Sequence, residues 1–313
     1  MLAVSKYLIV NADDFGMCKS ANEAVFDLFE KGKLFSSTIM LPCPAAVEAV
    51  EFSKEHPEYA IGVHLTLTSE WKNYRWKPLT DAPSLTDEEG FMWHKSDQVQ
   101  KHGKTKEIEK EVRAQIDYAH SLGMKPSHID NHMGSLYGHQ TGRFGLSHLT
   151  LDIMGEYGYA YRAFTKTDKS ICPNGTPYPI YRLAKYVFRG RIKKYGIVTP
   201  DYLLFPDWPA MYPKIGEMVK MPDGNYNCSI DEEISYLKYR DEILKIWTDI
   251  PDGVTETFLH PAKNTDELKS ITGSWVQRVF EYRLMDDDYT HEYLKEHGIK
   301  LISYRDLIEM KKK

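Results

Sequence analysis

The first seventy residues alternate between strand-like and helix-like segments, and this order restricts the possible folds more than any other feature. Apolar strands are expected at 7–10, 36–41 and 60–68, and an amphipathic helical segment separates each from the next. The first helix opens with the capping-box pattern of residues 20–23 and stops at Gly32. Such alternation indicates parallel strands joined by crossover helices, so we predict an α/β fold.

Two irregular stretches interrupt this pattern. Residues 70–103 form a long aromatic-rich segment, and a loop of that length inside a compact domain is usually functional. Residues at about 165–230 are rich in Pro, Gly and Tyr, with one helical stretch near 181–195, and are too sparse in apolar residues to form their own core. Further helices are expected at 105–122, 146–157 and 232–247, and further strands at 127–132, 159–164, 254–260 and 299–303. We therefore predict a single domain over 1–313, with an excursion at about 165–230.

Composition excludes several classes of protein. The net charge is −5, and the only long run of one sign is the terminal 311–313 lysine tail, so nothing indicates a nucleic-acid partner. No apolar run approaches the ~20 residues of a membrane-spanning helix. The N-terminus runs directly into a strand without a signal-peptide pattern, so we expect a cytoplasmic protein. The four cysteines are scattered and form neither a zinc-knot spacing nor a disulfide framework.

Two adjacent carboxylates, Asp13 and Asp14, follow the first strand directly. Acids at the C-terminal end of a parallel strand stand where α/β barrels place their chemistry. Because the two charges repel each other, the pair needs a metal ion or a strong hydrogen-bond donor beside it. The alternative is an ordinary Asp-Phe-Gly turn closed by Gly16 after an edge strand.

Three later strand ends also place metal-binding or proton-transferring side chains in positions that converge on one face of a parallel barrel. These residues are His64, the group His128, Asp130 and His132, and His260. One carboxylate with two imidazoles suits Zn²⁺, Fe²⁺, Co²⁺ or Ni²⁺, and Mg²⁺ is not excluded.

Each of these residues also has a purely structural interpretation. A lone histidine in an apolar strand, such as His64, is more often a hydrogen-bonded core residue than a ligand. His128 fits an exposed strand start, His132 a turn, and His260 the end of a strand. Taken singly, most of these alternatives are preferable. Taken together they require several coincidences on one face, so a functional site is favoured.

Five blocks of the sequence resemble the YdjC/ChbG-like carbohydrate deacetylases. They are IVNADDFG at 9–16, IGVHLTLT at 61–68, PSHIDNH at 126–132, LHPA at 259–262 and GIKLISYRD at 298–306. The blocks span nearly the whole chain, whereas about 165–250 contains no matching motif. One departure is plain: many members continue the position of His132 with further histidines, whereas Met133 and Gly134 stand here. The substrate-facing wall is therefore expected to differ.

The resemblance implies a distorted TIM-like (β/α) barrel, distantly related to the NodB-type polysaccharide deacetylases. It also implies a divalent metal, Mg²⁺ or Zn²⁺, and hydrolysis of N-acetyl groups on sugars or short oligosaccharides. By position, Asp14, His64 and His132 would hold the metal, Asp13 would be the general base, His260 the general acid, and Arg162 would steady the base.

An acetylated sugar is the expected partner, and flat or polar side chains near the strand ends are its expected contacts. These are Trp71, Tyr74, Trp76, Tyr137, His128 and Asp130, although an aromatic-rich loop also packs on itself. Exposed aromatics of 165–230 fit either a homodimer contact or a substrate lid. Two other functions stay open: a metal hydrolase of another amide or an ester, and a non-catalytic carbohydrate-binding barrel.

Overall fold

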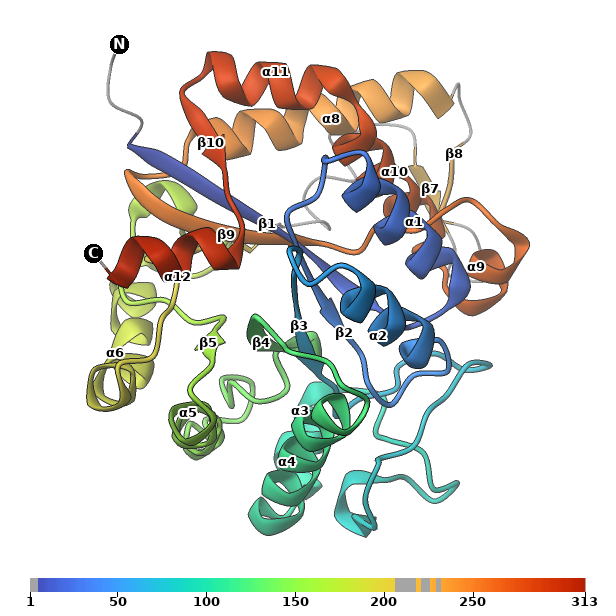
Figure 1. Cartoon of the computed structure of the whole chain (residues 1–313), viewed down its shortest axis with the longest axis vertical. Helices are drawn as coiled ribbons and strands as arrows, with labels where there is room; N and C mark the ends of the chain where they lie inside the picture. Colours follow the sequence, from blue (N-terminus) through green and yellow to red (C-terminus); the bar gives the residue numbers. More distant parts are fainter. Residues whose placement is uncertain (1–4, 206–217, 221–225, 229–231, 313) are drawn as a thin grey trace.

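A parallel β-sheet forms the centre of the molecule in the computed structural model, which describes residues 5–205, 218–220, 226–228 and 232–312 (Figure 1). The strand order is β5-β4-β3-β2-β1-β9-β6, and β10 pairs with β1 as an eighth strand. The strands are β1 (Lys6–Phe15), β2 (Ser36–Ile39), β3 (Ala60–Leu65), β4 (His128–Asn131), β5 (Ala160–Tyr161), β6 (Tyr202–Leu203), β9 (Gly253–Leu259) and β10 (Ile299–Leu301). The predicted α/β class is confirmed.

Strand β1 lies at the centre of this sheet and has three neighbours. One of its edges pairs with β9 from Lys6 to Ala12. The other edge pairs first with β10, from Lys6 to Leu8, and then with β2, from Asn11 to Phe15. The register with β2 shifts between Ala12 and Phe15, so the two consecutive aspartates lie in an irregular stretch at the end of the strand. Irregularities of this kind redirect side chains next to active sites.

Backbone hydrogen bonds connect the two edges of the sheet. The Tyr161 N–H donates to the Val198 carbonyl at 3.0 Å, and the Thr165 N–H donates to the Asp201 carbonyl at 3.2 Å. The Asp201 N–H in turn donates to Val254 of β9. The sheet therefore curves into a distorted barrel, as predicted.

The irregular interval 165–230 contributes to this barrel, because β6 lies within it. The same interval contains helix α6 (Tyr178–Tyr195) and an antiparallel pair formed by β7 (Met218–Lys220) and β8 (Tyr226–Cys228). The rest of the predicted excursion includes 206–217, 221–225 and 229–230, which lie outside the described residues.

Helices surround the sheet (Figure 1). They are α1 (Lys19–Glu30), α2 (Ala46–Glu55), α3 (Ser96–His102), α4 (Thr105–Ser121), α5 (Gly145–Tyr157), α6, α8 (Glu232–Thr248), α9 (Asp266–Ile271), α10 (Trp275–Asp286), α11 (Asp288–Glu296) and α12 (Tyr304–Lys312). Helix α1 begins at Lys19, so the capping box expected at 20–23 is wrong. The Ser20 hydroxyl donates instead to Glu267 of α9 and ties the two helices together.

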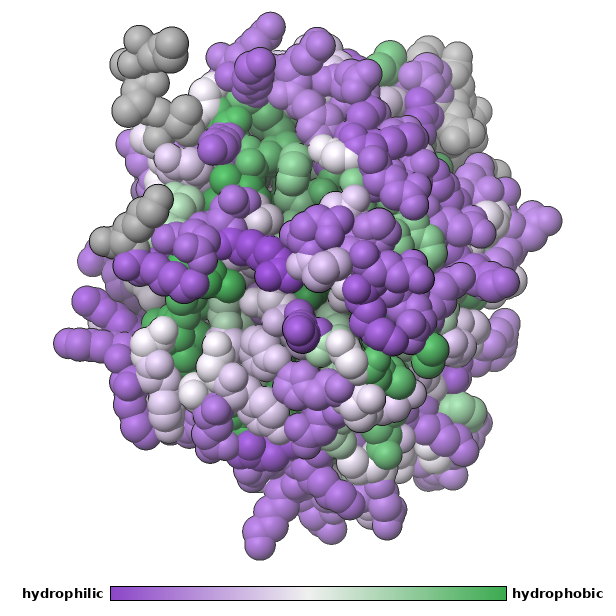
Figure 2. Space-filling model, in the orientation of Figure 1, coloured by the Kyte–Doolittle hydropathy of each residue, from purple (hydrophilic) through white to green (hydrophobic). Residues whose placement is uncertain are grey.

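Figure 2 shows a predominantly hydrophilic face interrupted by small apolar areas. Among the helices that the structure describes, none combines the length and the apolar character needed to cross a membrane.

Candidate metal centre and active site

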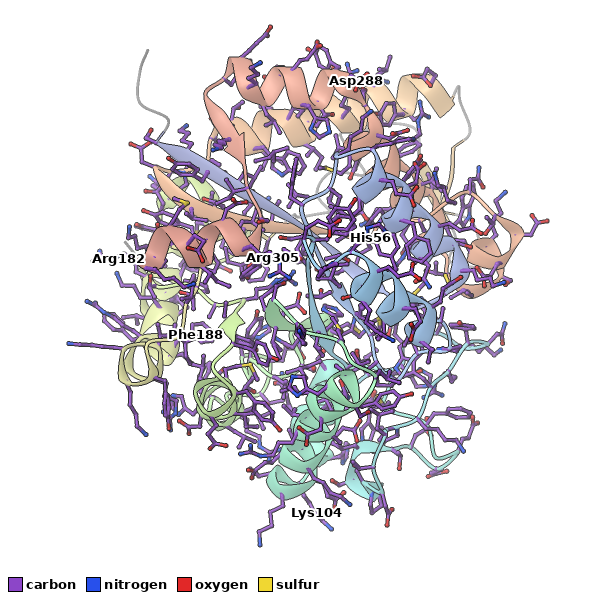
Figure 3. The ribbon with its side chains drawn as sticks, in the orientation of Figure 1. His56, Lys104, Arg182, Phe188, Asp288 and Arg305 are labelled. Atoms are coloured by element: carbon purple, nitrogen blue, oxygen red, sulfur yellow. The ribbon has the colours of Figure 1, made fainter. Side chains whose placement is uncertain are left out.

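The strand ends bring the predicted catalytic and metal-binding residues together inside the barrel. Asp13 and Asp14 lie at the end of β1, His64 lies in β3, and His132 begins a short 3₁₀ turn directly after β4. Arg162 and His260 follow β5 and β9. Many charged side chains project outward in Figure 3, such as Lys104 just before α4. The carboxylates and imidazoles of the barrel interior are buried instead, apart from the partly exposed His260.

Asp14, His64 and His132 form a compact cluster of potential ligands. The Asp14 Oδ1 atom lies 3.1 Å from His132 Nδ1 and 3.6 Å from His64 Nε2, and one ligand atom from each residue lies within 4.8 Å of the others. Asp14 Oδ1 is buried and has no hydrogen-bond partner among the described residues. A buried acceptor without a donor, facing two imidazole nitrogens, fits a bound divalent cation.

Electrostatics at this cluster also favour a positive charge. Burial opposes protonation of His132, but the carboxylates of Glu70 and Asp14 outweigh it and raise the pKa of His132 to about 10. Burial likewise opposes ionisation of Asp14, yet Arg278 and His132 hold its pKa well below the usual range. The site without metal therefore favours the protonated form of His132, and a metal that binds through Nδ1 has to displace a proton from that ring.

The backbone at the cluster is strained. Asp14 has φ 62° and Met133, next to His132, has φ 52°, and these are the non-glycine residues with positive φ in the described chain. Such conformations cost on the order of 1–3 kcal/mol and are found mainly at functional sites. These conformations occur at Asp14, whose Oδ1 lies 3.1 Å from His132 Nδ1, and at the residue that follows His132.

Arg162 holds Asp13 through a bidentate ion pair, with Nη1 2.7 Å from Oδ2 and Nη2 2.6 Å from Oδ1. The same guanidinium contacts Asp130 at 2.8 Å and Glu256 at 2.7 Å. Burial raises the pKa of Asp13, but the positive charge of Arg162 outweighs it, and this pKa is lowered to about 2. Asp13 is therefore an ionised carboxylate in a fixed orientation.

His128 and Asp130 are buried residues that contact other residues of the site. Asp130 Oδ1 lies 2.6 Å from His64 Nδ1, which leaves Nε2 of that ring facing Asp14. His128 stacks on Tyr304, with ring centroids 3.6 Å apart, and burial followed by the charge of Arg162 holds its pKa well below the usual range. Both side chains are fully buried in this structure, and their contact with a substrate stays a prediction.

His260 is more open to solvent than the other histidines of the site, with 23% of its side chain exposed. Its backbone N–H donates to the carboxylate of Glu281 at 2.5 Å, and its Nδ1 lies 3.7 Å from the same oxygen. Burial lowers the pKa of His260, but hydrogen bonding to Glu281 and the charge of Asp14 raise it overall. The imidazole therefore holds a proton more firmly than an ordinary histidine.

The predicted aromatic contacts differ in exposure. Trp76 is only 3% exposed, packs with its edge toward the His132 ring and donates from Nε1 to the Thr68 carbonyl. Tyr137 is partly buried, and its hydroxyl donates to the Arg162 carbonyl. Trp71 and Tyr74 are partly exposed, and the Arg278 guanidinium lies 5.5 Å from the Trp71 ring centroid. Trp71 and Tyr74 are the better placed of these residues to meet a ligand.

Four charged residues of the site were not found by the strand-end argument. Arg278 donates to Asp14 Oδ2 at 2.6 Å, and Glu70 lies 3.0 Å from His132 Nε2. Glu256 and Glu281 contact Arg162 and His260, as described above. Arg278 and Glu281 are three residues apart on one face of α10, and both are buried. A charged pair on the apolar face of a helix is the sequence feature that could have identified them.

The curved parallel sheet and the cluster at its carboxyl edge define an α/β barrel protein with a candidate centre for a divalent metal. The chain belongs to the family of YdjC-like proteins, whose model matches residues 7–296.

One relative covers this chain almost completely, and another covers less than half of it. A carbohydrate deacetylase of Geobacillus stearothermophilus is 27% identical over 306 residues, which is 97% of this chain and 99% of that protein. A chitooligosaccharide deacetylase of Yersinia enterocolitica is 34% identical over 134 residues, 41% of this chain and 50% of that protein. A crystal structure of an Enterococcus faecalis protein superimposes with a TM-score of 0.68 at 25% identity, covering 97% of this chain and 99% of that one. The resemblance predicted from the sequence blocks is confirmed.

Proposed function

We propose that this protein is a metal-dependent hydrolase that removes N-acetyl groups from acetylated sugars or short oligosaccharides. The observation that supports this proposal most directly is the position of an Arg162-held carboxylate, Asp13, beside the Asp14, His64 and His132 cluster. Relatives of the chain described as carbohydrate and chitooligosaccharide deacetylases point to the same substrate class.

Asp14, His64 and His132 would hold the metal through one carboxylate oxygen and two ring nitrogens. Zn²⁺ suits this donor set, and Mg²⁺ is the alternative. When bound, a divalent ion polarises an acetyl carbonyl and lowers the pKa of water, which addresses the low reactivity of both reactants.

Asp13 acts as the general base. Its carboxylate accepts a proton from the attacking water while the water oxygen bonds to the acetyl carbon, a role typically worth ~10²–10⁴-fold in rate. A carboxylate with a pKa of about 2 is a weak base. Arg162 contacts Asp130 and Glu256 as well as Asp13, so the three carboxylates share the positive charge of the guanidinium. The arginine also fixes the orientation of Asp13.

His260 acts as the general acid. The carbon–nitrogen bond breaks only if the amine receives a proton, and His260 is the exposed imidazole of the site whose pKa is raised. Glu281 fixes the position of His260 through its backbone N–H. The products are acetate and the free amino sugar, and Trp71 and Tyr74 offer partly exposed rings on which the sugar can lie.

The test is acetate release by protein stripped with chelator and then reloaded with single divalent metals. The substrates are N-acetylglucosamine and its short oligomers, with O-acetylated sugars and simple amides as a comparison panel. We expect metal-dependent release from the N-acetylated sugars. If one metal binds per chain but acetate or another product is released only from the O-acetylated sugars or the simple amides, the substrate assignment is wrong and the reactive compound replaces it. Binding of sugar without any acetate release would favour a carbohydrate-binding protein.

A further inference from the structure

The two histidines of the metal cluster present different ring nitrogens to it. His64 faces Asp14 with Nε2, and its Nδ1 lies 2.6 Å from Asp130. His132 faces Asp14 with Nδ1, and its Nε2 lies 3.0 Å from Glu70 Oε2. Each ring therefore has a carboxylate on the nitrogen that points away from the cluster.

This arrangement matters because a neutral imidazole binds a cation through only one nitrogen, and the other nitrogen carries the proton. An acceptor beside the protonated nitrogen fixes the tautomer, orients the ring and makes the ligand more basic. Glu70 occupies that position for His132. Asp130 does so for His64 from within the sheet, whereas Glu70 comes from the loop after β3.

The loop segment around Glu70 is anchored on both sides. The Ser69 N–H donates to the Trp93 carbonyl at 2.8 Å, and the Trp76 N–H donates to the Ser69 hydroxyl at 3.1 Å. Trp76 also packs against the His132 ring. These contacts hold the Glu70 backbone beside the metal cluster, although its side chain remains 20% exposed at an open pocket of about 610 Å³.

We propose that Glu70 is a positioning residue for the metal, acting through His132 by accepting the Nε2 proton and fixing the ring with Nδ1 toward Asp14. This inference rests on the metal site of the proposed function but not on the substrate. It also assigns a role to the long loop after β3, which closes one side of the metal centre.

The experiment measures the metal Kd of the full-length protein by competition with a chelator, using Zn²⁺ alone and no sugar. Glu70→Leu removes the acceptor, and we expect Kd to rise by about 10–100-fold. Glu70→Gln keeps an acceptor oxygen of the same reach and is expected to recover most of the lost affinity. Co²⁺-loaded protein provides a second readout, because a reoriented His132 changes the visible absorption bands of the ion.

Asp97→Leu is the matched control. Asp97 lines the same pocket but pairs with Lys101 at 2.7 Å and makes no contact with His132, so its variant is expected to keep the wild-type Kd. Thermal melts of the metal-free proteins check that each variant folds. Where Glu70→Leu does not fold, Glu70→Asp replaces it, because its shorter side chain keeps the charge and withdraws the acceptor.

The outcomes separate this inference from the proposed function. The role of Glu70 is overturned if a folded Glu70→Leu variant binds Zn²⁺ as tightly as the wild type and its Co²⁺ absorption is unchanged. This result would leave the proposed function standing. A wild-type protein that binds neither ion overturns both. Metal binding that depends on Glu70 supports the role of Glu70 even where no acetate is released.

Discussion

The guanidinium of Arg162 reaches both carboxylate oxygens of Asp13 across the barrel, at 2.6 and 2.7 Å, although the two residues are 149 positions apart. This pairing links the end of β5 to the end of β1. It also means that the ionisation of Asp13 depends on a residue on the far side of the sheet.

Arg162→Lys is expected to move the acid limb of the pH profile of kcat/KM to higher pH. Arg162 holds the pKa of Asp13 at about 2, below the ordinary value of about 3.9, so weakening the pair lets this pKa rise. A lysine keeps the charge but cannot make the bidentate contact, and a misplaced base costs ~10²-fold in kcat. An unchanged acid limb and unchanged kcat would remove Arg162 from its assigned role.

Asp13→Asn is expected to keep the metal and lose turnover. The amide cannot accept a proton from water, so kcat should fall by ~10²–10⁴-fold. Metal content measured by mass spectrometry should stay at the wild-type level, because Asp13 is not one of the three proposed ligands. Full activity in this variant would exclude Asp13 as the base.

His64→Ala and His132→Ala are each expected to lose the metal. Because a ligand that binds only the folded state stabilises it by RT ln(1 + [L]/Kd), saturating metal at 100 times Kd adds ~2.7 kcal/mol to the wild-type free energy of unfolding. Calorimetry with and without metal should show a rise in Tm for the wild type and none for either variant. An equal rise in all three proteins contradicts the ligand assignment.

His260→Ala is expected to affect substrates according to their leaving groups. An amine must be protonated to leave, whereas an activated phenol leaves without help. Release of acetate from N-acetylated sugars should therefore fall by ~10²-fold or more, and cleavage of an activated phenyl acetate should fall far less. Equal losses on both substrates would indicate a structural role.

Asp201→Ala is expected to lower stability without changing metal affinity. The Asp201 carboxylate accepts from the Val254 N–H at 3.1 Å and from Lys311 at 3.0 Å, next to the backbone contacts that close the barrel. Leaving the Val254 N–H unpaired costs about 1–3 kcal/mol, measurable by urea unfolding.

The same variant should show a defined pH dependence. Burial raises the pKa of Asp201, but the Val254 N–H and Lys311 outweigh it, so this pKa is lowered on folding. Its stabilisation is therefore present in full above the unfolded-state pKa of about 3.9 and is lost as pH falls below it. The gap between wild type and variant should shrink below about pH 4.

The residues at strand ends could be predicted from the sequence, because the C-terminal ends of parallel strands lie at the same edge of the sheet. Residues that are far apart in the sequence therefore lie close together there. Asp13, Asp14, His64, His132 and His260 were predicted by this rule, whereas Arg162 was assigned only through the family resemblance. Their mutual orientation was not predictable, since it depends on the register shift in β1 and on the positive φ of Asp14.

Residues from outside the strands escaped this reasoning. Glu70 lies in a loop, where no periodicity indicates which charged side chain turns inward. Arg278 lies with Glu281 on the buried face of α10, and a charged pair on that face was the signal available in the sequence. Glu256 sits in the middle of β9 and not at its end, so the strand-end argument did not reach it. The capping box at 20–23 failed because tertiary contacts of Ser20 with Glu267 replaced the local hydrogen bonds.

The position of β1 between β9, β10 and β2 also affects how the protein is made. Its partners in β9 and β10 are synthesised on the order of 240 residues later or more, which at ~5–20 residues per second is on the order of 10 s or more of translation. Until then the apolar first strand has β2 as its one partner from the early chain. Asp14 is therefore expected to reach its ligand position only after β9 has been synthesised, and nascent chains that stop before β9 are expected to be aggregation-prone and unable to bind metal.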